Sequence, residues 1–346
     1  MYKYTHFIPE NIAPSNVKSI GVYSANGNKV CNISLGRLTP PTQTKLYSFL
    51  ALSDVHVQYD TATDDLKRAL TYAESNCDFT CICGDLTQSG TDAHLTQYKN
   101  IASAYTKPIY AVGGNHDSIP EDQTSARISQ YTGQPMYYSF NKGDDVFIML
   151  SHYGKYEGDG TGWLASKFVS VEELQWLYET LEANRNKRCF IFNHVFPYED
   201  GVGDANRYYG GGQWRTKDGG VGQAFISLLK HYKNTILFHG HSHLRFHLQE
   251  VDKKANYSSA VGYRSVHIPS LAVPREPVNG TTTYIYAESE GYVIDVYRNY
   301  IVLNGRDFID NDADGHDIPL GTYKIDTKLV NIEAGTFTDS TGTITV

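Results

Sequence analysis

The sequence of 346 residues predicts an α/β protein. Apolar runs of strand length alternate with segments whose apolar residues recur at helical spacing. Polar side chains able to bind metals or transfer protons follow the ends of these runs. Open α/β sheets bind their ligands at the carboxyl ends of their strands, so we expect the functional site along one edge of a sheet.

The first 47 residues are expected to form a separate β-rich extension. Two short β-like runs, at 20–23 and 30–33, flank Asn26-Gly27. This dipeptide is a strong signal for a tight hairpin turn. What this extension binds is not evident from its sequence.

Residues 48–330 are expected to form the main domain, and residues 331–346 a tail or the start of a further β segment. Apolar runs predict strands at 49–52, 79–83, 109–112, 147–150, 190–192, 236–238, 292–297 and 301–303. Helical spacing predicts helices around 66–73, 95–105, 174–181 and 225–232. Ser170 and Glu173 have the spacing of a capping box at the start of the third helix.

Composition argues against several classes of protein. A net charge of -8 without a basic stripe disfavours an extended nucleic-acid surface. No apolar run reaches 18 residues, so we expect no transmembrane helix and no membrane partner. We also expect no signal peptide and a cytoplasmic location. The five cysteines lack a framework spacing and are expected to be reduced core residues: Cys31, Cys77, Cys81, Cys83 and Cys189.

Five short polar motifs follow one another along the chain, and each comes after an apolar run. They are Asp54-Val55-His56, Gly84-Asp85, Gly114-Asn115-His116-Asp117, Asn193-His194 and Gly240-His241-Ser242-His243. Residues two apart on an extended strand point the same way, which pairs Asp54 with His56 and His241 with His243. Oxygen and nitrogen ligands without thiolate suit manganese, iron, zinc or nickel better than calcium. The set predicts a metal centre.

Three members of the motifs are expected to do something other than bind a single metal. The Asp85 carboxylate is expected to bridge two metals, one through each oxygen. His116 follows the candidate ligand Asn115 and is expected to protonate the leaving group. Asp117 either orients the His116 imidazole or caps a turn, and the sequence leaves both interpretations open.

The order of these motifs resembles the calcineurin-like metallophosphoesterase superfamily over roughly residues 48–310. Segments 83–90 and 112–117 look most like its bacterial cyclic-nucleotide phosphodiesterase branch. The resemblance implies a four-layer αββα sandwich, in which two mixed sheets are flanked by helices. It also implies two metal sites: Asp54, His56, Asp85 and His243 for the first, and Asp85, Asn115, His194 and His241 for the second.

The resemblance implies a dinuclear phosphoester hydrolase, in which a hydroxide that bridges the metals attacks phosphorus in line. A nucleotide or another small phosphodiester is the favoured substrate. A nuclease or a phosphomonoesterase is the alternative among enzymes. The alternative of a different class is a non-catalytic interaction module that contains metal. Superfamily members of that kind usually lack the histidine at position 116, so its presence favours an enzyme.

Substrate recognition is expected in the glycine-rich segment 197–222, which would fold over the metals as a lid. Its candidate residues can clamp a phosphate or stack on a base: Arg207, Tyr208, Trp214 and Arg215. The alternative is a surface loop whose aromatic residues pack on the body. His239 is expected to be a buried strand residue, and the acidic segment 310–315 a turn instead of a calcium site.

Overall fold

The computed structural model divides the chain into two compact units, Met1–Thr44 and Lys45–Val346. The sequence places the corresponding boundary at residue 47. The described residues are 19–23, 29–34, 44–59, 61–117, 127–151, 169–195, 202–203, 221–250, 255–259, 262–278, 281–286, 288–309, 316–327, 338–339 and 342–343.

The first unit contains an antiparallel β-hairpin. Its strands are β1 (Ser19–Tyr23) and β2 (Lys29–Ser34). Ser19 pairs with Ser34 and Ile20 with Ile33. The two strands predicted around Asn26-Gly27 are therefore confirmed.

The second unit is built on two mixed sheets of six strands each. The first has the order β16-β15-β14-β3-β4-β5, with β3 (Tyr47–Leu52), β4 (Phe79–Cys83), β5 (Ile109–Val112), β14 (Glu290–Val296), β15 (Tyr300–Asp307) and β16 (His316–Asp326). The second has the order β10-β11-β9-β8-β7-β6, with β6 (Tyr138–Lys142), β7 (Asp145–Leu150), β8 (Cys189–Asn193), β9 (Thr235–His239), β10 (Tyr257–Ser258) and β11 (Ser265–His267). Strands β3, β4 and β5 are parallel, and so are β7, β8, β9 and β11.

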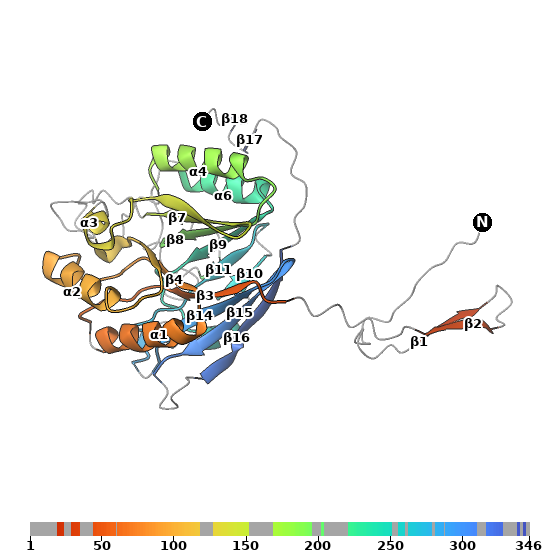
Figure 1. Cartoon of the computed structure of the whole chain (residues 1–346), viewed down its shortest axis with the longest axis horizontal. Coiled ribbons are helices and arrows are strands. Elements are labelled where there is room, and N and C mark those ends of the chain that lie inside the picture. The colour runs from red at the N-terminus through yellow and green to blue at the C-terminus, as the bar shows by residue number, and fades with distance from the viewer. Residues whose placement is uncertain are drawn as a thin grey trace. The chain divides into compact units, whose positions relative to one another are not determined.

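Helices cover the outer face of each sheet. These are α1 (Ala62–Asn76), α2 (Asp92–Ala102) and α3 (Ile128–Thr132) on the first sheet, and α4 (Val171–Ala183) and α6 (Val221–His231) on the second. Figure 1 shows the resulting layers, with α1 below the sheets and α4 and α6 above them. The predicted four-layer αββα sandwich is confirmed.

Alternating side chains build three hydrophobic layers. In β8, Phe190 and Phe192 point between the two sheets, whereas Ile191 packs toward α4 and α6. Between the sheets the Phe49 ring lies 5.2 Å from that of Phe147 and 5.7 Å from that of Phe190, both edge-on. Aromatic pairs prefer this geometry to a face-to-face arrangement. The resulting buried layer fixes the two sheets against each other.

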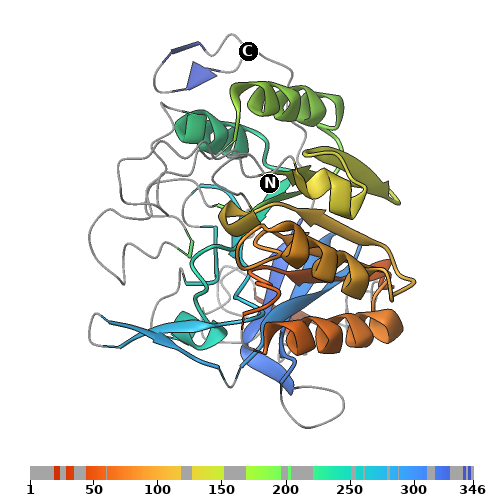
Figure 2. The same cartoon turned by 90° about the vertical axis from the view of Figure 1, so that its left-hand side faces the viewer.

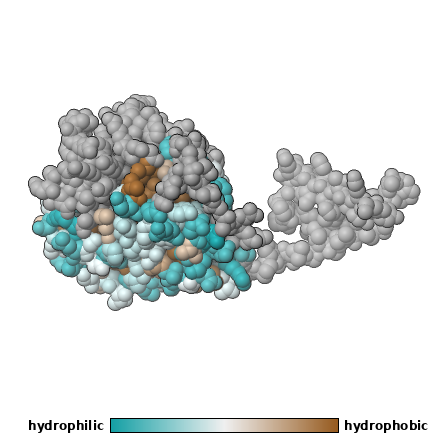
Figure 3. All heavy atoms as spheres, turned by 90° about the horizontal axis from the view of Figure 1, so that it is seen from above, coloured by the Kyte–Doolittle hydropathy of each residue, from teal (hydrophilic) through white to brown (hydrophobic). Residues whose placement is uncertain are grey.

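Smaller elements complete the second unit. The hairpin of β12 (Arg275–Val278) and β13 (Thr281–Tyr284) and the short pair β17 (Thr338–Asp339) and β18 (Gly342–Thr343) lie outside the two large sheets. In the view of Figure 3, the described residues present a mainly hydrophilic surface, with a hydrophobic area at its upper border and smaller ones below. Among the described residues, no helix has the length and apolar character required to cross a membrane.

Candidate metal centre

The five polar motifs meet at the carboxyl ends of five parallel strands. Strand β3 is followed by the first motif, β4 by the second and β5 by the third, which begins a short 3-10 helix. Strands β8 and β9 of the other sheet are followed by the fourth and fifth. The seven candidate ligands that they carry are Asp54, His56, Asp85, Asn115, His194, His241 and His243.

The ligand atoms form two groups that share one residue. Asp54, His56, Asp85 and His243 form the first group, and Asp85, His194 and His241 form the second. Within each group the ligand atoms lie within 4.8 Å of one another, and all of these residues are buried. Both groups could therefore hold a cation, and Asp85 would contact both cations.

Each of the two aspartates uses one oxygen for the backbone and presents the other to the histidines. Asp54 Oδ2 accepts a hydrogen bond from the His241 amide at 3.0 Å, and its Oδ1 lies 2.9 Å from His243 Nε2. Asp85 Oδ1 accepts from the His116 amide at 2.8 Å. Asp85 Oδ2 lies 3.2 Å from His194 Nε2 and 3.6 Å from His56 Nε2. One oxygen of Asp85 thus faces both groups, in contrast to the expected use of one oxygen per metal.

Backbone carbonyls orient two of the histidines. His194 Nδ1 lies 2.7 Å from the Cys83 carbonyl, and His243 Nδ1 lies 3.1 Å from the Val273 carbonyl. A carbonyl oxygen can only accept, so Nδ1 carries the proton in both rings and Nε2 is directed to the carboxylates. This second hydrogen bond is typical of histidines that bind metals through Nε2.

Burial and the charges of neighbouring side chains shift the pKa values of the site residues. Burial raises the pKa of Asp54, but His243 and His194 outweigh it and hold that pKa well below its usual value. Burial lowers the pKa of His194, but Asp85 and Asp54 outweigh it and raise that pKa to about 9. Burial lowers the pKa of His56 well below its usual value.

Several buried polar atoms of the site make no hydrogen bond. Among the candidate ligands they are Asp54 Oδ1, His56 Nδ1, Asn115 Oδ1 and His194 Nε2. Burying such atoms without a partner costs about 1–3 kcal/mol each. A cation at each group would satisfy the atoms of Asp54, Asn115 and His194, and Asn115 would then join the second group as a neutral oxygen ligand. The residues present therefore fit two hard or borderline cations.

The backbone at the site is strained. Five of the seven candidate ligands adopt positive φ, which is uncommon for residues other than glycine. The φ angles are 51° for Asp54, 46° for His56, 49° for Asp85, 74° for His241 and 60° for His243. Gln58 is the one other non-glycine residue with positive φ in the described part of the chain. Such strain concentrates at functional sites, where the surrounding structure must hold it.

Gly84 is required by both conformation and space. Its φ is +84°, and a β-carbon there would lie 2.5 Å from Cβ of His194. The Asp85 side chain can reach the second sheet's histidine because this backbone passes so close to it.

Asp117 holds two loops together. Its Oδ2 accepts from the amides of Leu86 and Gly114, and its Oδ1 accepts from the amide of Thr87, each at 2.9 Å. The partner observed for His116 Nδ1 is the Gln88 carbonyl at 2.9 Å. These contacts are those of a loop-positioning residue, the second of the two interpretations left open for Asp117. The His116 ring lies 4.7 Å from the His56 ring, beside the first ligand group.

Other sequence-based expectations have mixed outcomes. His239 is confirmed as a buried residue of β9, and burial lowers its pKa to about 3. Cys77, Cys81, Cys83 and Cys189 are confirmed as buried free thiols. The expected substrate residues lie outside the described residues; they are Arg207, Tyr208, Trp214 and Arg215. The acidic segment 310–315 also lies outside them.

The structure adds residues that the sequence analysis missed. The Arg275 amide donates to the His243 carbonyl at 2.7 Å, and its charge, after burial, is the main cause of the lowered pKa of His243. Tyr59 lies close to His56, with ring centroids 6.5 Å apart. Tyr59 is only three residues from His56 in the sequence, and this closeness could have indicated that it lies near the site. No local motif marks Arg275, which reaches the site through tertiary structure alone.

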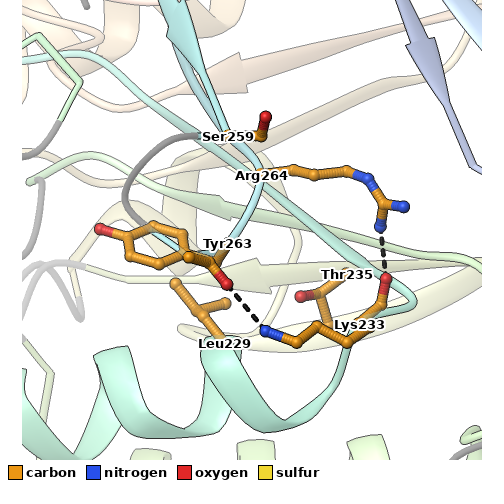
Figure 4. Close-up of a pocket in the computed structure, with 7 residues that line it drawn as sticks. Leu229, Lys233, Thr235, Ser259, Tyr263 and Arg264 are labelled. Atoms are coloured by element: carbon orange, nitrogen blue, oxygen red, sulfur yellow. Dashed lines mark hydrogen bonds between the residues drawn. The ribbon is translucent and has the colours of Figure 1, made fainter.

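A separate cavity of about 220 Å³ lies at the amino end of β9, the end opposite to the candidate metal ligands. It is lined by Leu229, Lys233, Thr235, Ser259, Gly262, Tyr263 and Arg264 (Figure 4). Lys233 Nζ donates to the Gly262 carbonyl at 2.8 Å, and Arg264 donates to the Lys233 carbonyl. Since both cations already have backbone partners, this cavity carries no argument for an anion site.

The chain belongs to the calcineurin-like phosphoesterase family, because the family model matches residues 47–245, more than half of its length. Among curated proteins, none matches the sequence. The solved structure of GAP50, the anchor in the inner membrane complex of Plasmodium, shares 13% identity with a TM-score of 0.51, covering 86% of this chain and 92% of that one.

Two other structures are similar at lower TM-scores. A predicted phosphoesterase from Streptococcus pneumoniae shares 11% identity over 81% of this chain and 97% of that one, with a TM-score of 0.40. Vacuolar protein sorting 29 from Cryptosporidium parvum shares 14% identity over 82% of this chain and all of that one (100%), with a TM-score of 0.37. At these identities the likeness concerns the fold alone.

Proposed function

We propose that the chain is a metal-dependent phosphoester hydrolase that binds two transition-metal ions, such as manganese, iron, zinc or nickel. The observation that carries this proposal is the pair of ligand groups that share Asp85. The first ion would be held by Asp54, His56, Asp85 and His243. The second would be held by Asp85, Asn115, His194 and His241. Such a pair supplies positive charge to the phosphate and a nucleophile derived from water.

The protein's own groups would position and protonate the substrate. The Gln88 carbonyl accepts a hydrogen bond from His116 Nδ1. To act as the acid, the ring would be the imidazolium form, which carries a second proton on Nε2 and would deliver that proton to the departing oxygen. The His116 amide is tied to Asp85, so the imidazole is fixed relative to the residue shared by both groups. Asp117 keeps the two loops that carry Asp85 and His116 in register.

A small phosphodiester is the substrate class we favour, on the likeness of segments 83–90 and 112–117 to cyclic-nucleotide phosphodiesterases. The net charge of -8 disfavours long nucleic acids, which would need a basic surface. A nuclease and a phosphomonoesterase are the alternatives, and the assay described next separates them from a phosphodiesterase.

The test is reconstitution of metal-stripped protein with manganese, iron, zinc or nickel. Metal content is measured by mass spectrometry. Hydrolysis is measured with bis(4-nitrophenyl) phosphate, 4-nitrophenyl phosphate and a single-stranded oligonucleotide. We expect two ions per chain and the fastest turnover with the diester. Fewer than two ions per chain would refute the dinuclear centre, and faster turnover of the monoester or the oligonucleotide would refute the substrate class.

A non-catalytic role is the second candidate, because GAP50, which is described as an anchor, shares the fold. Two bound ions without turnover on any of the three substrates would favour this role. Fold likeness alone does not decide between the two. The position of His116 beside the ligand groups favours catalysis.

A further inference from the structure

A cationic and aromatic surface borders the candidate metal centre. Arg275 begins β12, and Tyr284 ends β13 of the same hairpin, which is the blue hairpin at the lower left of Figure 2. Tyr286 follows two residues later, and Tyr59 comes from the loop after His56. We call Tyr59, Tyr284 and Tyr286 the tyrosine face.

The Arg275 backbone is fixed directly beside a candidate ligand. The Arg275 amide donates to the His243 carbonyl at 2.7 Å, and Arg275 forms an isolated parallel β-bridge with Leu244. This places the arginine at the rim of the first ligand group.

The Arg275 guanidinium has no carboxylate partner within the described part of the chain. Its Nε is buried and makes no hydrogen bond, and its charged carbon lies 5.0 Å from the Tyr284 ring centroid. The neighbouring Arg245 differs, because it donates to Glu276 at 2.8 Å and also to Glu288. A half-buried guanidinium without a counter-ion is costly, and an anionic ligand would remove that cost.

The tyrosine face is ordered by its own contacts and remains open to solvent. The Tyr59 and Tyr286 hydroxyls lie 3.3 Å apart, and the Tyr284 and Tyr286 rings stack with centroids 6.0 Å apart. Tyr284 is 43% exposed and Tyr286 is 47% exposed. Both are among the four large hydrophobic side chains that are exposed in the described residues. Ordered, exposed rings beside a cation suit a ligand that has both a planar group and a negative charge.

We propose that Arg275 and the tyrosine face recognise the substrate of this centre, a phosphodiester whose non-leaving ester group is aromatic. The planar guanidinium binds a phosphate oxygen, and the tyrosine rings stack on the aromatic ester group. The proposal rests on the phosphoesterase function proposed above. It goes further by placing specificity in the β12–β13 hairpin and the loop after His56.

A pair of diesters with the same leaving group separates these contacts from the chemistry. Bis(4-nitrophenyl) phosphate and methyl 4-nitrophenyl phosphate both release 4-nitrophenolate, but only the first has an aromatic non-leaving group. With the metal-loaded full chain, Tyr284→Ala should raise KM for the first about 5-fold and leave KM for the second unchanged. Arg275→Ala should raise KM for both about 10-fold, because both carry the phosphate.

Conservative and remote variants control for structural damage. Tyr284→Phe keeps the ring and should behave as the wild type, whereas Arg275→Lys keeps the charge without the planar fork and should restore only part of the loss. Tyr297→Ala and Arg298→Ala remove a tyrosine and an arginine side chain at the turn after β14. That turn lies at the end of the sheet opposite to the candidate ligands, because Val296 pairs with Tyr47 at the start of β3. Neither control should change either KM.

Calorimetry provides a readout that does not require turnover. Adenosine 5′-monophosphate and ribose 5-phosphate differ only in the base, and the wild type should bind the former more tightly. Tyr284→Ala should reduce the difference in affinity between the two ligands, and Arg275→Ala should lower the affinity for both. Equal binding of the two ligands by the wild type, or affinities unchanged in both variants, would overturn the proposal. Absence of hydrolysis together with the expected binding pattern would overturn the proposed function instead.

Discussion

Asp85 is the residue on which both ligand groups depend. Asp85→Asn should reduce bound metal to at most one ion per chain and lower kcat at least about 100-fold, because an amide nitrogen replaces an anionic oxygen that faces two histidines. Metal content and kcat are the measurements. Asp64→Asn, which alters a carboxylate with 68% side-chain exposure in α1, is the matched control. Two ions and a normal rate in the Asp85 variant would end the shared-ligand assignment.

His116 should affect the rate without affecting metal content. We expect His116→Ala to keep two ions per chain and to lose about 100-fold in kcat, the usual contribution of a general acid. The loss should be smaller for esters of 4-nitrophenol than for alkyl esters, whose leaving oxygen needs a proton. Kinetics across a series of leaving groups measures this. Equal losses across the series would show that His116 is not the acid.

The candidate ligands could be predicted as a set, from five motifs in a fixed order, whereas the residues that position them could not. Each ligand follows an apolar run, so the sequence alone places it at a strand end. Asp117 could not be assigned because its partners are backbone amides of Leu86, Thr87 and Gly114, and the sequence does not show which loops meet. Arg275 was missed for the same reason, since its contact with His243 comes from chain folding alone.

Strands were predictable where they are buried on both faces. β4 and β8 are buried at every position, and four of the five residues in each are apolar. β6 was missed because it forms the edge of its sheet, and its residues are alternately half-buried and exposed. The predicted second helix ends at Ala102, so Tyr105 lies beyond it, although it still packs against the same core.

The cap of α4 links that helix to the end of β7. The Ser170 hydroxyl accepts from the Glu173 amide at 3.0 Å, which confirms the predicted cap. The Glu173 side chain accepts from the Ser151 amide at 2.7 Å and is fully buried. The helix start is thereby fastened to the strand.

Glu173 should make stability depend on pH. Burial raises its pKa from 4.5 to about 8. Because the native state favours the protonated acid more than the unfolded state does, its stabilising contribution is full below pH 4.5 and is lost as pH rises to about 8. Glu173→Gln keeps the acceptor without the charge and should be more stable than the wild type at pH 9 by on the order of 5 kcal/mol, with no difference below pH 4.5.

Denaturant unfolding of the wild type and the variant between pH 4 and pH 9 measures this difference. Glu172→Gln, at the exposed neighbouring position, should follow the wild type at every pH. Identical curves for the wild type and Glu173→Gln at pH 9 would show that the buried side chain is ionised in the native state without cost.

At the scale of the whole molecule, the residue pattern predicts one α/β sheet, and the family resemblance was needed to predict two. The first sheet is completed by β14, which pairs antiparallel with β3 although the two are far apart in sequence. Periodicity within a segment has no information on such long-range pairing. The family match over 47–245 also ends before β14, so the closing strands lie outside it.

The division of the chain predicts that the second unit is self-sufficient. Both ligand groups and the three large core clusters consist of residues within Lys45–Val346. The first residues of this unit already contact its sheet: Lys45 forms an ion pair with Asp295 at 3.0 Å, and the Leu46 amide donates to the Val296 carbonyl at 2.8 Å. A protein truncated to residues 45–346 retains these contacts. It should bind as many ions per chain as the full chain, with Tm changed by no more than about 2 °C. Metal analysis and calorimetry test this, and loss of metal or of cooperative unfolding on truncation would show that residues 1–44 are part of the folded core.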